Sequence, residues 1–219
     1  MEKETSRDRL TAAAFALFAE QGYDATTVDE IAARAGVGRT TYFRNFRTKE
    51  DVVFPEHEDL LAAIEGRLAA ATKGNSLVAI VDAARLVLRH YLDEGDLARS
   101  RYALTSAVPA LRDREIASAQ RYRLKFKRFI LGWLGDEPRA ELQADLMAAA
   151  VVTAHNHVLR RWLREQTSTP EAEFDEAMAE VSAIYGRRSS SEETTVVVLR
   201  SSSDVEALLP RIREALERD

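Results

Sequence analysis

The chain of 219 residues contains no cysteine, which excludes disulfide bonds and thiol chemistry. Glycine and proline are sparse, with nine and five copies, and they fall where helices are expected to end. No apolar run approaches the roughly 20 residues that a membrane-spanning helix needs. The N-terminus is charged and carries no apolar signal segment. We therefore expect a cytoplasmic protein that does not contact a membrane.

Motifs for catalysis and for metal binding are also missing. There is no glycine-rich phosphate loop, and no Ser-His-Asp order predicts a nucleophilic site. His155 and His157 are two residues apart and point to different sides of a helix. His57 and Glu58 lack the second histidine of a zincin motif. We expect neither an enzyme nor a bound metal or cofactor.

The charge of the chain gives only partial guidance. The formal net charge is −5, whereas a DNA-binding protein often carries a basic patch. Residues 1–50 hold eight basic and eight acidic residues, so the whole excess of negative charge lies after residue 50. DNA binding would have to rest on the placement of Arg39, Arg44, Arg47 and Lys49.

Residues 26–52 have the spacing of a helix-turn-helix, which places one helix in the DNA major groove. Thr27 and Glu30 form a capping box at the start of the first helix. Gly36 ends that helix, because the position after a helix commonly needs a positive φ. Gly38 opens the next helix, which runs from about 39 to 46. The alternative interpretation is an ordinary pair of helices with a solvated polar face.

The second helix of this pair is expected to present polar residues outward. Phe43 and Phe46 share a face and should pack inward. Arginine can donate to guanine, threonine can touch a thymine methyl, and tyrosine or asparagine can bond phosphate or adenine. Lys49 would lie in the first turn of a following helix capped by Thr48, where it could hold a phosphate. The side chains predicted to contact DNA are Thr27, Arg39, Thr40, Thr41, Tyr42, Arg44, Asn45, Arg47, Thr48 and Lys49.

Residues 6–53 resemble the N-terminal region of the TetR family of bacterial transcriptional regulators. Gly38 and Arg47 depart from the family pattern, which often has serine and proline there. The resemblance implies an N-terminal helix that packs over the two helices of the helix-turn-helix. It also implies a homodimer and a double-stranded DNA operator. The matching residues are Leu10, Ala13, Ala14, Phe15, Leu17, Phe18, Gly22, Tyr23, Thr27, Ile31, Ala32, Ala35, Gly36, Val37, Thr41, Phe43, Phe46, Lys49 and Glu50.

The rest of the chain predicts a helical body followed by an unusual tail. We expect helices over 48–71, 77–92, 97–107, 109–134, 139–166 and 171–185, with Pro55 bending or splitting the first of them. Residues 194–199 are strongly strand-like, and an amphipathic helix follows from Asp204. The predicted fold is thus all-α with an extra C-terminal strand and helix. Its expected domains are 1–50 for DNA binding, 51–186 for ligand binding and dimerisation, and 187–219 as an extension.

The central helices also predict a small-molecule site, because a few polar groups occur among aromatic residues at inward-facing positions. A plain core is the competing interpretation for each of these residues. The resemblance to the TetR family also implies that residues 138–186 form a four-helix dimer bundle with a second copy. The alternative is that these helices only close the core of one chain. The candidate ligand-binding residues are Tyr91, Tyr102, Phe126, Ile130, Trp133, His155, Asn156 and Leu159.

Together these patterns predict a regulator, expected to be a repressor, that binds a palindromic operator as a homodimer. A small apolar or amphipathic effector would bind one conformation better and change the spacing of the DNA-reading heads. The rival hypothesis is a DNA-binding module whose body and tail bind a partner protein instead. A closed apolar cavity between the central helices would distinguish the two.

Overall fold

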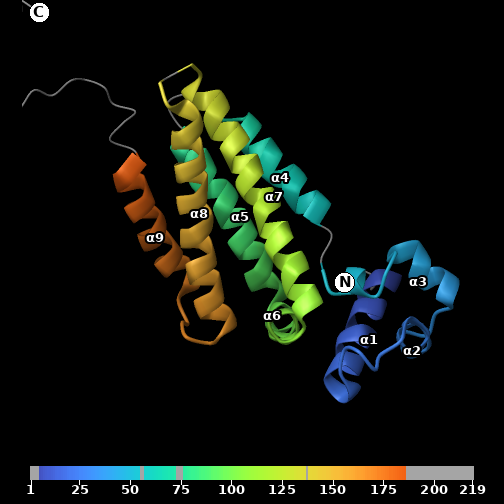
Figure 1. Cartoon of the computed structure of the whole chain (residues 1–219). Coiled ribbons are helices and arrows are strands. Elements are labelled where there is room, and N and C mark those ends of the chain that lie inside the picture. Colours follow the sequence, from blue (N-terminus) through green and yellow to red (C-terminus); the bar gives the residue numbers. More distant parts are fainter. Residues whose placement is uncertain (1–4, 55–56, 73–75, 137, 186–219) are drawn as a thin grey trace, which may run out of the picture. The chain divides into compact units, whose positions relative to one another are not determined.

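The computed structural model describes residues 5–54, 57–72, 76–136 and 138–185, and all regular structure in these ranges is helical (Figure 1). The all-α prediction is therefore confirmed for this part of the chain. The predicted tail strand over 194–199 and the helix after it lie outside the described residues. No helix within the described ranges is long and apolar enough to cross a membrane.

The first three helices form the N-terminal head: α1 (Ser6–Gln21), α2 (Val28–Arg34) and α3 (Arg39–Asn45). The capping box at α2 is confirmed, since the Thr27 hydroxyl accepts from the Glu30 amide at 3.2 Å and the Glu30 carboxylate accepts from the Thr27 amide at 2.8 Å. Gly36 has a φ of +65°, as its place in the turn between the helices requires.

The head has its own apolar core. Leu10 and Ala14 of α1 pack with Ile31 of α2, and Phe46 closes the core after α3. Leu111, which belongs to the next region of the chain, is fully buried in the same cluster. The head core is therefore completed by a residue from the body.

The helix expected over 48–71 does not form as one piece. A short 3-10 turn, η1 (Glu50–Val52), follows the head, and α4 (His57–Ala69) begins later. The Asp51 carboxylate accepts from the amides of Arg47 and Thr48 at 2.9 and 3.0 Å, so the chain turns here instead of continuing as an α-helix. Thr48 does not cap a helix as predicted. Pro55 itself lies outside the described residues.

The body consists of α4, α5 (Ser76–Glu94), α6 (Asp96–Ala107), α7 (Pro109–Leu134), α8 (Ala140–Leu163) and α9 (Pro170–Tyr185). The bounds predicted for α7 agree with the structure, whereas α8 ends three residues earlier than predicted. Figure 1 shows α8 between α7 and α9, and α8 packs on both of these helices and on α5.

The core of the body is larger than that of the head. Ile80 and Leu88 of α5, Ile130 of α7, Val151 of α8 and Phe174 of α9 are fully buried within it. Burying a side chain of this size contributes about 1.5–3 kcal/mol each. These contacts fix α5, α7 and α8 around the cavity described below.

Candidate functional site

The exposed face of α3 carries much of the predicted DNA-contacting set. Arg39, Thr40 and Arg44 are exposed, and Thr41 and Asn45 are half-buried. Beyond the helix, Arg47 and Thr48 are exposed as well. Thr27 is exposed at the start of α2, where its hydroxyl is already bonded in the capping box. Whether these side chains contact DNA stays a prediction.

The structure contradicts the predicted orientation of two aromatic residues in α3. Tyr42 was expected to face outward, but it is fully buried, and its hydroxyl donates to the Thr48 carbonyl oxygen at 3.0 Å. Phe43 was expected to pack inward, but it is 43% exposed. The error arises because Phe46 shares a face with residue 43 at spacing three and with residue 42 at spacing four, and both spacings are helical.

Lys49 also differs from its predicted role. Its ammonium group donates to the carbonyl oxygens of Tyr23 and Thr26 at 2.8 and 3.0 Å, and it lies 4.2 Å from the centre of the Tyr23 ring. The group therefore fastens the turn between α1 and α2 to the start of η1. It does not point outward toward a phosphate.

The arginines of the α3 face divide into paired and free side chains. Arg39 forms an ion pair with Asp29 of α2 at 2.6 Å, and both side chains are more than half exposed. The guanidinium groups of Arg44 and Arg47 have no hydrogen bond or ion pair among the described residues. An exposed, unpaired guanidinium group can bind a phosphate without first breaking a contact.

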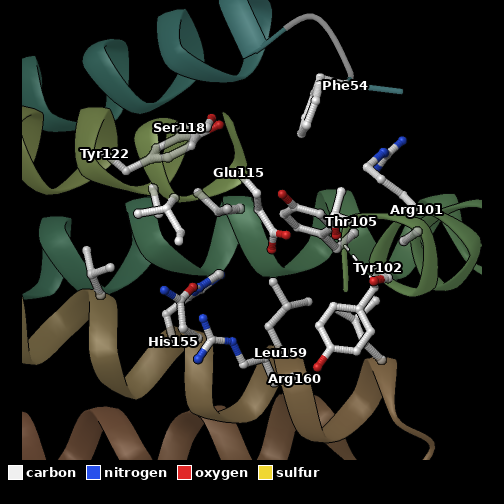
Figure 2. Close-up of a pocket in the computed structure, with 18 of the residues that line it drawn as sticks. Phe54, Arg101, Tyr102, Thr105, Glu115, Ser118, Tyr122, His155, Leu159 and Arg160 are labelled. Atoms are coloured by element: carbon white, nitrogen blue, oxygen red, sulfur yellow. Dashed lines mark hydrogen bonds between the residues drawn. The ribbon is translucent and has the colours of Figure 1, made fainter. Parts of the chain in front are cut away.

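A second candidate site is a cavity of about 530 Å³ in the body (Figure 2). Its walls come from α5, α6, α7 and α8, and from Phe54 after η1. A volume of this size is typical of sites for drug-sized molecules. Six of the predicted ligand-binding residues line it, namely Tyr91, Tyr102, Phe126, His155, Asn156 and Leu159.

The other two predicted ligand-binding residues do not line the cavity. Ile130 is fully buried in the core of the body, and Trp133 is half-buried against that core. They lie four and seven residues beyond Phe126 on α7, or about 6 and 10 Å farther along the helix axis. Along α7 the cavity extends only as far as Phe126, so these two side chains lie beyond its end.

Several cavity residues were missed by the sequence analysis. Glu115, Ser118 and Tyr122 precede Phe126 on the same face of α7, and all four line the cavity. Their spacing of three and four residues was the available signal. Arg101 and Thr105 of α6 are buried side chains in the cavity wall and were also missed.

Arg101 connects the cavity to the end of the head. Its guanidinium group donates to both carboxylate oxygens of Glu94 at 2.6 and 2.8 Å and to the Val53 carbonyl oxygen at 2.7 Å. Val53 is fully buried in the head core, and the next residue, Phe54, lines the cavity. The wall of the cavity is thus bonded directly to the segment that leaves the head.

His155 is a buried titratable group in the cavity wall. Burial lowers the pKa of its imidazole to about 4, although the hydrogen bond with the Asn156 side chain acts in the opposite direction. The ring is therefore neutral at pH 7. Its Nε2 atom is buried without a hydrogen-bond partner in the described part of the chain. No group of three metal-ligating side chains occurs among the described residues.

Comparison with known proteins agrees with the geometry of the head. Residues 10–64 match the family model for bacterial regulatory proteins of the tetR family. The chain is 30% identical over 173 residues to the HTH-type transcriptional regulator TcmR of Streptomyces glaucescens, and the match covers 74% of this chain and 75% of that protein. The chain belongs to the TetR family. It is a DNA-binding transcriptional regulator with a helix-turn-helix.

Solved structures of regulators share the fold. One is SmeT in complex with triclosan, which has a TM-score of 0.60 and 16% identity, and the match covers 91% of this chain and 99% of SmeT. Another is NalD of Pseudomonas aeruginosa, a repressor of a multidrug efflux pump, with a TM-score of 0.57 and 18% identity over 83% of this chain and 97% of NalD. At this level of identity the similarity concerns the fold alone.

Proposed function

We propose that the protein is a ligand-responsive repressor that binds a palindromic operator as a homodimer. The observation that carries this proposal is the cavity whose wall contains both Arg101, bonded to the Val53 carbonyl, and Phe54. A molecule in this cavity would contact the segment that leaves the DNA-binding head. The volume of the cavity supports a small effector over the rival hypothesis of a partner protein. It is not the closed apolar cavity expected from the sequence, because charged side chains such as Glu115 and Arg160 line it.

A second set of contacts extends from the body toward α3. Arg114 of α7 forms an ion pair with Asp51, and its guanidinium group lies 5.1 Å from the centre of the Phe54 ring. The Asp51 carboxylate in turn accepts from the amides of Arg47 and Thr48, directly after α3. A shift of Phe54 on ligand binding would therefore disturb the residues that fix the end of α3. A ligand changes the equilibrium only by its difference in affinity for the two arrangements.

The dimer surface that we propose lies on α8 and α9. Leu142 and Leu146 of α8 and Ile184 of α9 are 56%, 52% and 64% exposed, and α8 and α9 pack on each other. Exposed apolar side chains on neighbouring helices can form an interaction surface. Pairing of these helices with a second copy would cover them in a four-helix bundle. Two heads could then read half-sites about 34–36 Å apart.

Val151 of α8 lies within the predicted dimer segment 138–186 but is fully buried inside a single chain. A charge there would disrupt the core of the body as well as any dimer. Leu146→Glu is the better test, because the side chain is exposed and a buried unpaired charge would form only in the dimer. We expect this variant to sediment as a folded monomer at micromolar concentration, whereas the matched variant Leu124→Glu on α7 should remain a dimer. A wild-type protein that is monomeric would contradict the proposal.

Selection from a random DNA library tests operator binding directly. We expect the full-length protein to enrich a two-fold symmetric sequence. Arg44→Ala should weaken binding to all DNA sequences alike. It should also reduce the slope of the logarithm of the binding constant against the logarithm of the salt concentration by about one. Arg39→Ala should cost about 1–3 kcal/mol and relax the preference at one position of each half-site. Enrichment of no sequence, or of a single unrepeated half-site, would overturn the proposed mode of binding.

A further inference from the structure

The cavity contains one acidic side chain among the described residues that line it, and that side chain is unpaired. Glu115 projects from α7 toward the side of the cavity formed by α8 (Figure 2). It is half-buried, and its carboxylate makes no hydrogen bond or ion pair with any described residue. A carboxylate removed from water is costly unless it is paired. The Glu115 carboxylate therefore has no positively charged partner among the described residues.

Aromatic rings surround the same space. Phe54, Tyr91, Tyr102, Tyr122 and Phe126 all line the cavity, and they come from α5, α6, α7 and the segment after η1. The face of an aromatic ring attracts a cation electrostatically, and the attraction is stronger where water is excluded. A carboxylate among several rings is a combination that suits a positively charged, largely apolar molecule.

The arginines that line the cavity do not reverse this preference. Arg101 is neutralised by Glu94, with which it shares two hydrogen bonds. Arg164 donates to the Tyr102 hydroxyl at 2.7 Å, and Arg112 donates to the Ser106 carbonyl oxygen. Arg160 makes no side-chain hydrogen bond or ion pair with a described residue, and Arg112 and Arg164 keep their charge because their acceptors are neutral. All three of these arginines are exposed. Water and salt screen exposed charges more strongly than a half-buried one.

We infer that the effector is a lipophilic cation, with an aromatic or aliphatic body that fills the cavity and one positive charge held by Glu115. This inference rests on the proposed function, because it assigns a chemical class to the ligand of the same cavity. A volume of about 530 Å³ accommodates a drug-sized molecule. Quaternary ammonium and phosphonium ions and protonated tertiary amines belong to this class.

Two probes of matched shape and opposite charge test the inference. Tetraphenylphosphonium and tetraphenylborate each carry four phenyl groups, so that calorimetric titration of the full-length protein compares charge at nearly constant size. We expect the cation to bind at least about tenfold more tightly, which corresponds to roughly 1.4 kcal/mol. Tighter binding of the borate, or failure of the cation to bind, would overturn the inference.

Variants of α7 identify the residue responsible. Glu115→Gln keeps the size of the side chain and should weaken binding of the cation about tenfold while leaving binding of the borate unchanged or stronger. Asp113→Asn is the matched control, since Asp113 is an exposed acid on α7 that does not line the cavity. It should bind both ions as the wild type does. Equal loss in the two variants, or no loss in Glu115→Gln, would contradict the role of Glu115.

The same titrations separate this inference from the proposed function. If the cation binds through Glu115 but operator affinity does not respond, the ligand class stands and regulation through this cavity fails. If operator affinity responds to a neutral or anionic compound while the cation does not bind, the regulatory function stands and the ligand class is wrong.

Discussion

The head and the body of this regulator differ in how completely they satisfy their polar groups. In the head, the Tyr23 hydroxyl donates to Glu50, the Tyr42 hydroxyl donates to the Thr48 carbonyl, and Lys49 donates to two carbonyl oxygens. In the described residues, the buried side-chain atoms without a hydrogen bond all lie in the body: Nε2 of His90 and His155, and Nε of Arg99. The unpaired Glu115 carboxylate is there too.

This difference indicates what each region has to do. A head that positions α3 against DNA needs one rigid arrangement, and satisfied polar contacts hold a unique structure. A body that responds to a ligand can gain affinity for that ligand if some of its polar groups have no protein partner and only the ligand can pair with them. Buried polar groups are normally hydrogen-bonded, and of the three exceptions only the His155 imidazole belongs to a residue that lines the cavity, so this one calls for a functional explanation.

The strongest test of the comparison is at the junction of the two regions. Arg101→Met would leave Glu94 as a largely buried carboxylate without its partner, and breaking such a pair costs about 3–5 kcal/mol. Chemical denaturation of the variant should show this loss of unfolding free energy. The double variant Arg101→Met/Glu94→Leu should recover most of it, because neither charge remains. A single variant as stable as the wild type would show that the pair does not hold the junction.

Truncation of a core side chain should cost more unfolding free energy in the tightly packed head than beside the cavity of the body. Leu10→Ala in the fully buried core of the head is expected to cost about 2–5 kcal/mol, since it creates a new cavity. Leu159→Ala should fall at the lower end of that range, because this side chain already borders open space. Urea unfolding curves of the two variants provide the measurement. A larger loss for Leu159→Ala would reverse the proposed order.

Substitution of Lys49 tests whether its ammonium group stabilises the turn between α1 and α2 or contacts DNA. Lys49→Met should destabilise the protein by about 1.5–3 kcal/mol, because charged hydrogen bonds to two carbonyl oxygens are lost. Its operator binding should retain the salt dependence of the wild type. If the variant kept full stability and lowered the salt dependence by about one ion, the phosphate role predicted from the sequence would be correct after all.

The buried imidazole of His155 should make the body sensitive to mild acid. Burial lowers its pKa from 6.5 to about 4, so between these values the unfolded chain binds a proton that the native protein does not. The stabilisation is complete above pH 6.5 and is lost as the pH falls toward 4. At pH 5 the loss from this residue should be about 2 kcal/mol relative to pH 7.5. His155→Leu should remove that part of the pH dependence, and an unchanged pH profile in the variant would refute the assignment.

The sequence predicted the head well where local signals decide the structure. The capping box of Thr27 and Glu30 and the stop at Gly36 depend on neighbours within a few residues, and both are confirmed. Tyr42 and Phe43 were exchanged because helical spacing permits either side chain in the core. The choice is made by the carbonyl of Thr48, whose position depends on a turn that the sequence analysis did not recognise.

The cavity was predicted only in outline, because its polar residues gain their role from tertiary structure. Aromatic residues such as Tyr91 and Phe126 are recognisable as inward-facing from their periodicity. Glu115 lies in the charged run Arg112-Asp113-Arg114-Glu115, which in sequence has the composition of a solvated helix face. Its place in the cavity follows from the packing of α7 on α6 and α8.

The most direct test of the account measures operator affinity with and without a cavity ligand. Fluorescence anisotropy of labelled operator DNA, with tetraphenylphosphonium at a concentration that calorimetry shows to be saturating, gives the coupling between the two sites. We predict that the bound cation weakens operator binding by on the order of 5–150-fold, the range typical of allosteric coupling. By linkage, operator DNA should weaken binding of the cation by the same factor. Unchanged operator affinity in a protein whose cavity is occupied would contradict the central claim that this cavity controls the head.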